Sequence, residues 1–168
     1  MCKNSLFKYF FLLIVGLTMT SSCERDDLCS LSFDVTPMLI IEFYDINEPE
    51  SLKPVQDFAF VAVGASDTIS IASTNELRIP LRNTENTTSY LFAINASNPE
   101  TLNVDELQFN YRVSDVYVNR ACGFRGEFLD FQAIRRTAQA PETNWIRNLS
   151  VQQSNIRNEN QTHLYIFH

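Results

Sequence analysis

The sequence predicts an all-β protein: a β-sandwich of about eight or nine short antiparallel strands behind a cleaved signal peptide. Beyond residue 22, short apolar runs alternate with clusters of Asn, Asp, Ser and Pro, which is typical of strands joined by turns. No long segment repeats its apolar residues at the spacing of an amphipathic helix. These observations favour a sandwich of the immunoglobulin-like or prealbumin-like type.

The first 22 residues have the layout of a bacterial lipoprotein signal peptide. Lys3 and Lys8 supply positive charge, and residues 9–17 form a short apolar run. A membrane-spanning helix needs about 20 apolar residues, so this run fits a signal peptide better than an anchor. Small residues at 20–22 precede Cys23, which predicts cleavage there and attachment of lipid to the Cys23 thiol. The alternative is an ordinary secretory signal peptide cut nearby, with Cys23 left as a spare thiol.

The segment after the signal peptide predicts how the protein is attached. We interpret residues 23–30 as the lipidated cysteine with an acidic tether, and residues 31–168 as one β-sandwich domain. Two interpretations of the acidic residues stay open. They form a solvated linker, or they form an export signal, because they resemble the surface-export signal of Bacteroidota lipoproteins. The residues concerned are Glu24, Asp26 and Asp27.

The apolar pattern places the strands of the first half of the domain. We expect strands at residues 37–45, 55–63, 68–72, 76–81 and 90–95. The first two of these are apolar on both faces, so they should lie centrally in a sheet. The strand at 76–81 alternates between apolar and polar residues, as expected where one face is buried.

The second half contains the clearest strand signal, at residues 106–113, where apolar and polar residues alternate strictly. The alternation changes phase at Ser114 and Asp115, which predicts a bulge or a sharp bend. The segment at 133–142 should be irregular or a short helix. The remaining expected strands are 124–131, 145–156 and 163–167, the last two forming a hairpin across 157–162.

Cys29 and Cys122 are the two cysteines that remain after cleavage and lipidation. An even pair in an oxidising compartment favours a disulfide, and the phase of the preceding strand directs Cys122 toward the core. Such a bridge closes about 94 residues and is worth roughly 4–5 kcal/mol in the chain-entropy model. A redox pair or a metal site fits less well, because the two cysteines are far apart in sequence and have no neighbouring histidine.

Charge and motif content exclude several classes of function. Loss of residues 1–22 removes two lysines and no acidic residue, so the net charge changes from −7 to −9. This charge disfavours binding to nucleic acid. His163 and His168 should point to opposite faces of their strand, and no catalytic or metal-binding motif occurs. We therefore expect no enzymatic activity, no cofactor and no metal. Trp145 is the aromatic residue that we expect to be most exposed, and it is the candidate ligand contact.

Several short motifs in the mature chain occur together: CERDDLC at 23–29, TP at 36–37, FYD at 43–45, VYV at 116–118 and ACGF at 121–124. Together they resemble a family of Bacteroidota lipoproteins of unknown function (DUF6452-like). The resemblance implies an outer-membrane lipoprotein and supports the pairing of Cys29 with Cys122. It implies no activity and no catalytic residue.

We therefore expect a non-enzymatic lipoprotein, anchored by lipid in the outer membrane on its periplasmic face or at the cell surface. It should dock onto another envelope protein, such as an outer-membrane β-barrel. The alternative is a surface module that binds glycans or nutrients. An exposed row of aromatic side chains that includes Trp145 would favour ligand binding, whereas a flat apolar patch or an open sheet edge would favour docking.

Overall fold

The computed structural model describes residues 29, 35–136 and 143–168, and confirms the all-β fold. The described residues contain no helix, and therefore no helix that could cross a membrane. The chain divides into two units, Asp34–Tyr117 with Phe124–His168 and Met1–Phe33 with Val118–Gly123. The strands are β1 (Leu39–Tyr44), β2 (Val55–Ala62), β3 (Ile69–Thr74), β4 (Glu76–Ile79), β5 (Thr87–Ile94), β6 (Asn103–Asn119), β7 (Gly123–Arg135), β8 (Asn148–Val151) and β9 (Leu164–Phe167).

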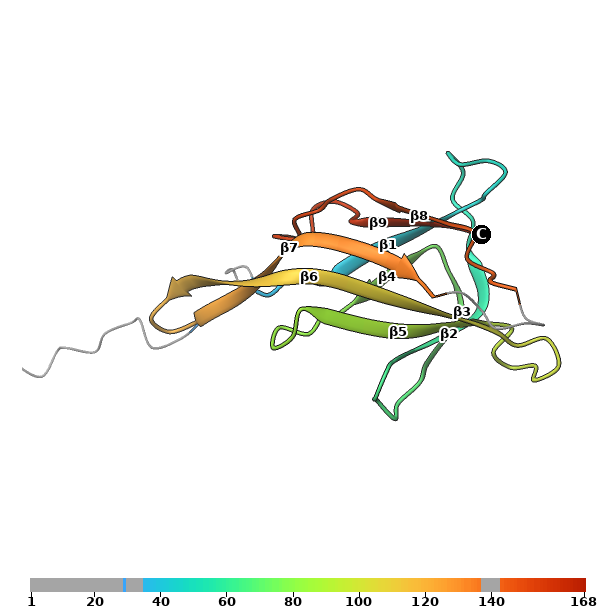
Figure 1. The fold of residues 1–168 in the computed structure, drawn as a ribbon, viewed down its shortest axis with the longest axis horizontal. Coiled ribbons are helices and arrows are strands. Elements are labelled where there is room, and N and C mark those ends of the chain that lie inside the picture. Colours follow the sequence, from blue (N-terminus) through green and yellow to red (C-terminus); the bar gives the residue numbers. More distant parts are fainter. Residues whose placement is uncertain (1–28, 30–34, 137–142) are drawn as a thin grey trace, which may run out of the picture. The chain divides into compact units, whose positions relative to one another are not determined.

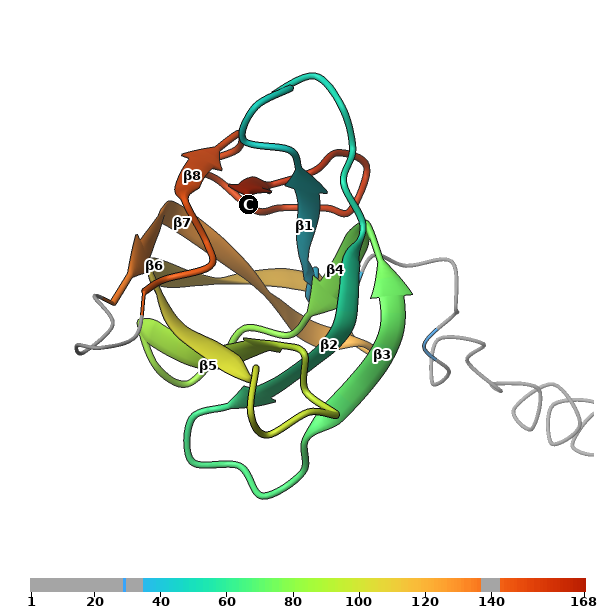
Figure 2. The ribbon, with the colours of Figure 1, turned by 90° about the vertical axis from the view of Figure 1, so that its right-hand side faces the viewer.

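Two sheets form the sandwich. One has four strands in the order β4-β1-β9-β8, and the other has five in the order β3-β2-β5-β6-β7. Figure 1 shows β1, β8 and β9 on one side of the fold and β2 and β5 on the other, and Figure 2 gives the view at right angles. Most pairs are antiparallel, but β1 and β9 run parallel, with Ile41 opposite Leu164. This one pair departs from the antiparallel arrangement that the sequence predicts.

Apolar side chains from both sheets form one core. Phe43 of β1 packs edge to face against Phe58 of β2, with ring centroids 5.7 Å apart, and so connects the two sheets. Both rings are fully buried. Burial of a Phe side chain stabilises a fold by about 1.5–3 kcal/mol, so this pair contributes substantially to the packing of the two sheets.

Two aspartates with positive φ change which face of their strand is buried. Asp57 in β2 has φ 45° and lies between the core residues Val55 and Phe58. In a regular strand, residues three apart point to opposite faces. The left-handed conformation, which Asp tolerates better than most residues, lets both apolar neighbours reach the core. Asp130, with φ 57°, occupies the same kind of position in β7.

The strands β6 and β7 are longer than the sequence predicts, with 17 and 13 residues. Along β6 the burial pattern changes phase where Val113 and Ser114 are both half-buried, after which Asp115 and Tyr117 are exposed. The phase change is therefore confirmed, although β6 continues through it. The segment expected to be irregular or helical begins as strand, because β7 runs on to Arg135, and residues 137–142 lie outside the described part.

The last two strands pair as expected, but the first of them is shorter. β8 and β9 are antiparallel, with Leu149 opposite Ile166. The predicted strand at 145–156 is reduced to the four residues of β8. Beyond it, Ile156 forms an isolated bridge to Phe128 of β7, so this segment contacts the other sheet.

Candidate functional site

The predicted disulfide between Cys29 and Cys122 is confirmed. The Cα atoms of the two cysteines are 4.8 Å apart, within the usual range for a disulfide. Cys122 lies in the turn between β6 and β7, where Asn119 Oδ1 accepts hydrogen bonds from the N–H groups of Ala121 (2.9 Å) and Cys122 (2.7 Å). The expectation that Cys122 points into the core from a strand is therefore wrong. The bridge joins Cys29 to a hairpin turn.

The residues expected to carry lipid and an export signal lie outside the described residues. They are Cys23, Glu24, Asp26 and Asp27. Of the expected tether at 23–30, the structure describes Cys29 alone. The roles assigned to these residues remain predictions.

Trp145 is buried, which corrects its assignment as an exposed ligand contact. Its side chain is 6% exposed, and its indole N–H donates a hydrogen bond to the carbonyl oxygen of Phe92 (3.1 Å). The buried carboxylate of Asp105 holds this segment, because it accepts hydrogen bonds from Asn144 Nδ2 (2.7 Å) and from the N–H of Ile146 (2.8 Å). The sequence does not reveal this anchor, so Trp145 cannot be placed from the sequence alone.

The two histidines serve the fold. His163 Nδ1 accepts a hydrogen bond from the N–H of Ile40 (3.0 Å), so Nε2 carries the proton and donates to the carbonyl oxygen of Asn158 (3.0 Å). His168 Nε2 lies 3.0 Å from the carbonyl oxygen of Lys53. Burial lowers the pKa of both imidazoles, which favours their neutral forms. Among the described residues, no group of three or more His, Cys, Asp and Glu side chains is placed to hold a metal ion.

An apolar groove lies on the outer face of the five-stranded sheet. It has a volume of about 260 Å³ and is lined by residues of β2, β3, β5 and β6. Ala59 of β2 lies opposite Ala93 of β5, and the next pair on the same face of the sheet is Val61 with Leu91. The two alanines have short side chains between larger neighbours, and this difference in size creates the hollow.

The loop at residues 95–102 borders this groove and is held by Asp57. The Asp57 carboxylate accepts hydrogen bonds from the N–H (2.9 Å) and the hydroxyl (2.6 Å) of Ser97. The same hydrogen bonds lower the pKa of Asp57 below its usual value. Asp57 therefore has two structural roles: its positive φ lies where β2 shifts, and its carboxylate holds the loop that ends at Leu102 beside the groove.

The groove corresponds to one feature of the sequence, an apolar strand pattern that by itself does not distinguish a covered face from an open one. The strand at 55–63 is apolar on both faces, which predicts a central position covered on both sides. β2 is central in its sheet, but its outer face forms the groove instead of packing beneath another layer of described residues. The continuous apolar run at 55–63 thus has one face buried in the core and one face that lines the groove.

Comparison with known proteins identifies a family. A family model, described as a family of unknown function (DUF6452), matches residues 59–168. The matched region contains the second half of β2, all later strands and Cys122. No curated protein and no solved structure matches the chain.

Proposed function

This chain belongs to a family of unknown function, DUF6452, and we propose that it is a lipid-anchored docking subunit of the outer membrane without enzymatic activity. The anchor would be the lipid on Cys23, which follows a signal peptide of lipoprotein layout. Two or three acyl chains give stable attachment to a membrane. The docking surface would be the apolar groove on the five-stranded sheet, and this groove is the observation that carries the proposal.

The size of the groove favours a protein partner over a soluble ligand. Sites for small molecules usually enclose about 300–1,000 Å³ and combine apolar walls with several polar groups. The groove encloses about 260 Å³, and Thr68 and Ser70 supply the hydroxyl groups among its lining side chains. The groove has room for a few apolar side chains of a partner. It offers few polar groups that could orient a sugar.

The edge strand beside the groove offers main-chain hydrogen bonds to the same partner. β3 is at the end of the sheet order and is mostly exposed. Its sequence, ISIAST, has no charged residue and no proline, the two features that commonly protect an edge strand. An extended segment of an outer-membrane β-barrel protein could therefore pair with β3 and place apolar side chains in the groove.

The alternative, a module that binds glycans or nutrients, has less support. It depends on an exposed row of aromatic side chains that includes Trp145, and the Trp145 ring is buried in the core. Among the described residues that line the groove, Phe60 is the aromatic one, and its side chain belongs mainly to the core. A platform for stacking on sugar rings is therefore absent from this part of the described surface.

Site-specific photo-crosslinking tests the docking proposal. A photoreactive amino acid in place of Leu102, which is exposed at the groove, should crosslink to an outer-membrane β-barrel protein in intact cells. The same amino acid in place of Val151, which is similarly exposed on β8, should not. Mass spectrometry of the crosslinked peptides identifies the partner. Equal crosslinking at the two positions, or none to an envelope protein, would contradict the proposal.

Filling the groove supplies a second measurement. Ala93→Leu extends a side chain into the hollow without changing the core face of β5, and should reduce crosslinking at Leu102. Ala65→Leu, in the exposed turn after β2, is the matched control and should leave it unchanged. If Ala93→Leu crosslinks as well as the control, the partner does not enter the groove.

A further inference from the structure

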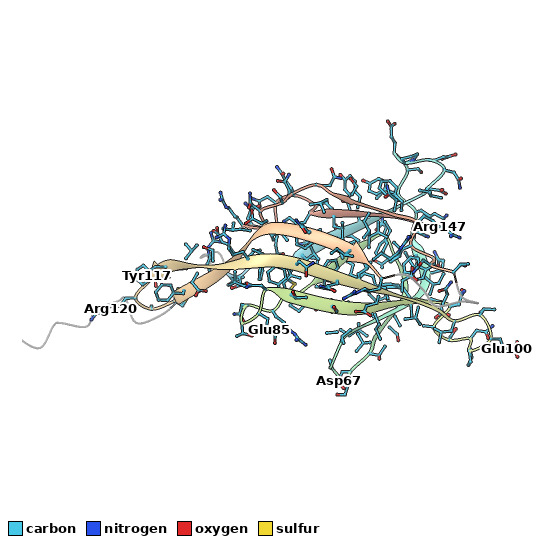
Figure 3. The ribbon with its side chains drawn as sticks, in the orientation of Figure 1. Asp67, Glu85, Glu100, Tyr117, Arg120 and Arg147 are labelled. Carbon is cyan, nitrogen blue, oxygen red and sulfur yellow. A yellow bond between two sulfur atoms is a disulfide. The ribbon has the colours of Figure 1, made fainter. Side chains whose placement is uncertain are left out.

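Two exposed aromatic side chains contact each other near the end of the β6–β7 hairpin. Tyr117 is 59% exposed and Phe124 is 68% exposed. Their ring centroids are 5.4 Å apart, with the rings edge to face. Figure 3 labels Tyr117 in this part of β6. Among the exposed large hydrophobic side chains of the described residues, these two are the aromatic ones. The other aromatic rings in the described part of the chain are buried or partly buried.

The segment that carries this pair is free of acidic residues in a chain that is strongly acidic. Residues 116–124 read VYVNRACGF, with one arginine and no Asp or Glu. The whole chain has a net charge of −7, so this stretch is unlike its average surface. A negatively charged headgroup layer would repel most of the chain but not this segment.

The disulfide limits how far this segment can lie from the lipidated residue. Cys23 and Cys29 are six residues apart, so an extended chain between their Cα atoms spans at most about 20 Å. The bridge adds 4.8 Å between the Cα atoms of Cys29 and Cys122. Phe124 follows Cys122 by two residues, at most about 7 Å. The Phe124 Cα therefore lies within about 32 Å of the Cys23 Cα along this covalent route.

We propose that Tyr117 and Phe124 form a membrane contact that inserts into the headgroup layer beside the lipid anchor. The inference rests on the proposed lipidation of Cys23. Tyr and Phe suit this place, because an aromatic body can be buried among acyl chains while the Tyr hydroxyl stays with water and headgroups. The contact gives the Cys29–Cys122 bridge a function: it holds one end of a hairpin near the bilayer.

Fluorescence quenching by lipid tests the contact. The lipidated protein is reconstituted into vesicles of phosphatidylethanolamine and phosphatidylglycerol whose acyl chains carry bromine, which quenches tryptophan at close range. Phe124→Trp should be quenched several-fold more strongly than Leu52→Trp, whose site is exposed in the connection between β1 and β2. Trp145 is buried and present in both variants, so its background is the same. Reduction of the disulfide should bring the Phe124→Trp signal toward that of the control.

Mass measurement of the same samples separates the two hypotheses. If Cys23 carries acyl chains and Phe124→Trp is quenched no more than Leu52→Trp, the membrane contact is wrong and the anchoring proposal stands. If Cys23 carries no lipid, both are wrong. If quenching is strong but survives reduction, the aromatic pair contacts the membrane and the role assigned to the bridge is wrong.

Discussion

At the scale of single residues, the buried polar groups of this protein hold segments that lack regular structure. Asp105 is 1% exposed and accepts hydrogen bonds at both carboxylate oxygens, one from Asn144 and one from the backbone of Ile146. These contacts fix the chain on both sides of Trp145, which places the indole in the core. A buried carboxylate without such donors would be unfavourable, so the segment and the charge stabilise each other.

Replacement of Asp105 by Asn should therefore be costly despite its similar size. Asn has one acceptor oxygen, and its amide N–H₂ would face one of the two donors. We expect the free energy of unfolding to fall by about 1.5–3 kcal/mol, as for hydrogen bonds to charged groups. Urea denaturation measures this loss. Glu106→Gln, on the opposite face of β6, is the control and should be close to neutral, and an equal effect of both would contradict the role of Asp105.

The histidines predict a dependence of stability on pH. Burial lowers the pKa of His163 in the folded state, so the unfolded state binds the proton more readily. Neutral His163 makes its full contribution to the free energy of unfolding above the unfolded pKa of about 6.5. That contribution is lost as the pH falls from there toward the lowered pKa of the folded state. The carboxyls of Asp45 and Asp57 also have lowered pKa values, but their contribution is lost only below about pH 4.

We expect a lower melting temperature near pH 5 than near pH 7.5, and a smaller difference in His163→Gln. Scanning calorimetry at the two values measures it. His168→Gln should also reduce the difference, because burial lowers that pKa too. A pH dependence unchanged in both variants would assign the effect to other groups.

At the scale of elements, local pattern identified strands better than it identified their partners. The alternation along 106–113 predicts β6 because each side chain there alternates between core and surface. No local pattern predicts that β1 lies parallel to β9, since the paired residues Ile41 and Leu164 are far apart in sequence. The shift at Asp57 is not predicted either, because the Asp57 carboxylate contacts Ser97, which lies 40 positions away in the sequence.

The disulfide stabilises the fold by tying Cys29 to the turn between β6 and β7. It spans 93 positions of sequence, and its loss should lower the free energy of unfolding by about 2–5 kcal/mol. The double variant Cys29→Ser with Cys122→Ser should match the reduced wild type in urea denaturation. Non-reducing peptide mass mapping of the oxidised wild type should recover the two cysteines in one linked pair. Free thiols at both positions, or a double variant as stable as the oxidised protein, would contradict this assignment.

At the scale of the whole molecule, the sequence predicts fold class and attachment but not the docking surface. Fold class follows from the period of apolar residues, which is clearest along β4, β5 and the first half of β6. The groove depends on which short side chains meet across β2 and β5, as Ala59 and Ala93 do, and this requires the register. The contact between Tyr117 and Phe124 likewise requires the hairpin, because the two rings come from different strands.

Lipidation is the first prediction at this scale. Cys23→Ala should leave a precursor that keeps its signal peptide and takes up no acyl label, because the Cys23 thiol is the proposed site of lipid attachment. Gel mobility and labelling with a clickable fatty acid measure both effects. Cys29→Ala is the control and should be labelled normally. A Cys23→Ala protein that is processed and still carries labelled lipid would show that the anchor is elsewhere.

Export to the cell surface is the second prediction, and it distinguishes a signal from a plain linker. Replacement of Glu24, Asp26 and Asp27 by Ala removes three negative charges directly after the anchor. If these residues form the export signal, protease added to whole cells should digest this variant less than the wild type, while labelling of Cys23 is unchanged.

The matched control must change the net charge equally at another place. Glu48, Glu50 and Asp67 are exposed in loops of the sandwich, and their replacement by Ala also removes three negative charges. This control should be digested like the wild type, because an export signal acts only next to the lipidated residue. A general effect of net charge would instead appear in both variants. Equal digestion of both variants would assign the acidic residues to a solvated linker. If protease never reaches the wild-type protein on whole cells, the protein lies on the periplasmic face of the outer membrane. Its groove would then meet the periplasmic side of a β-barrel protein.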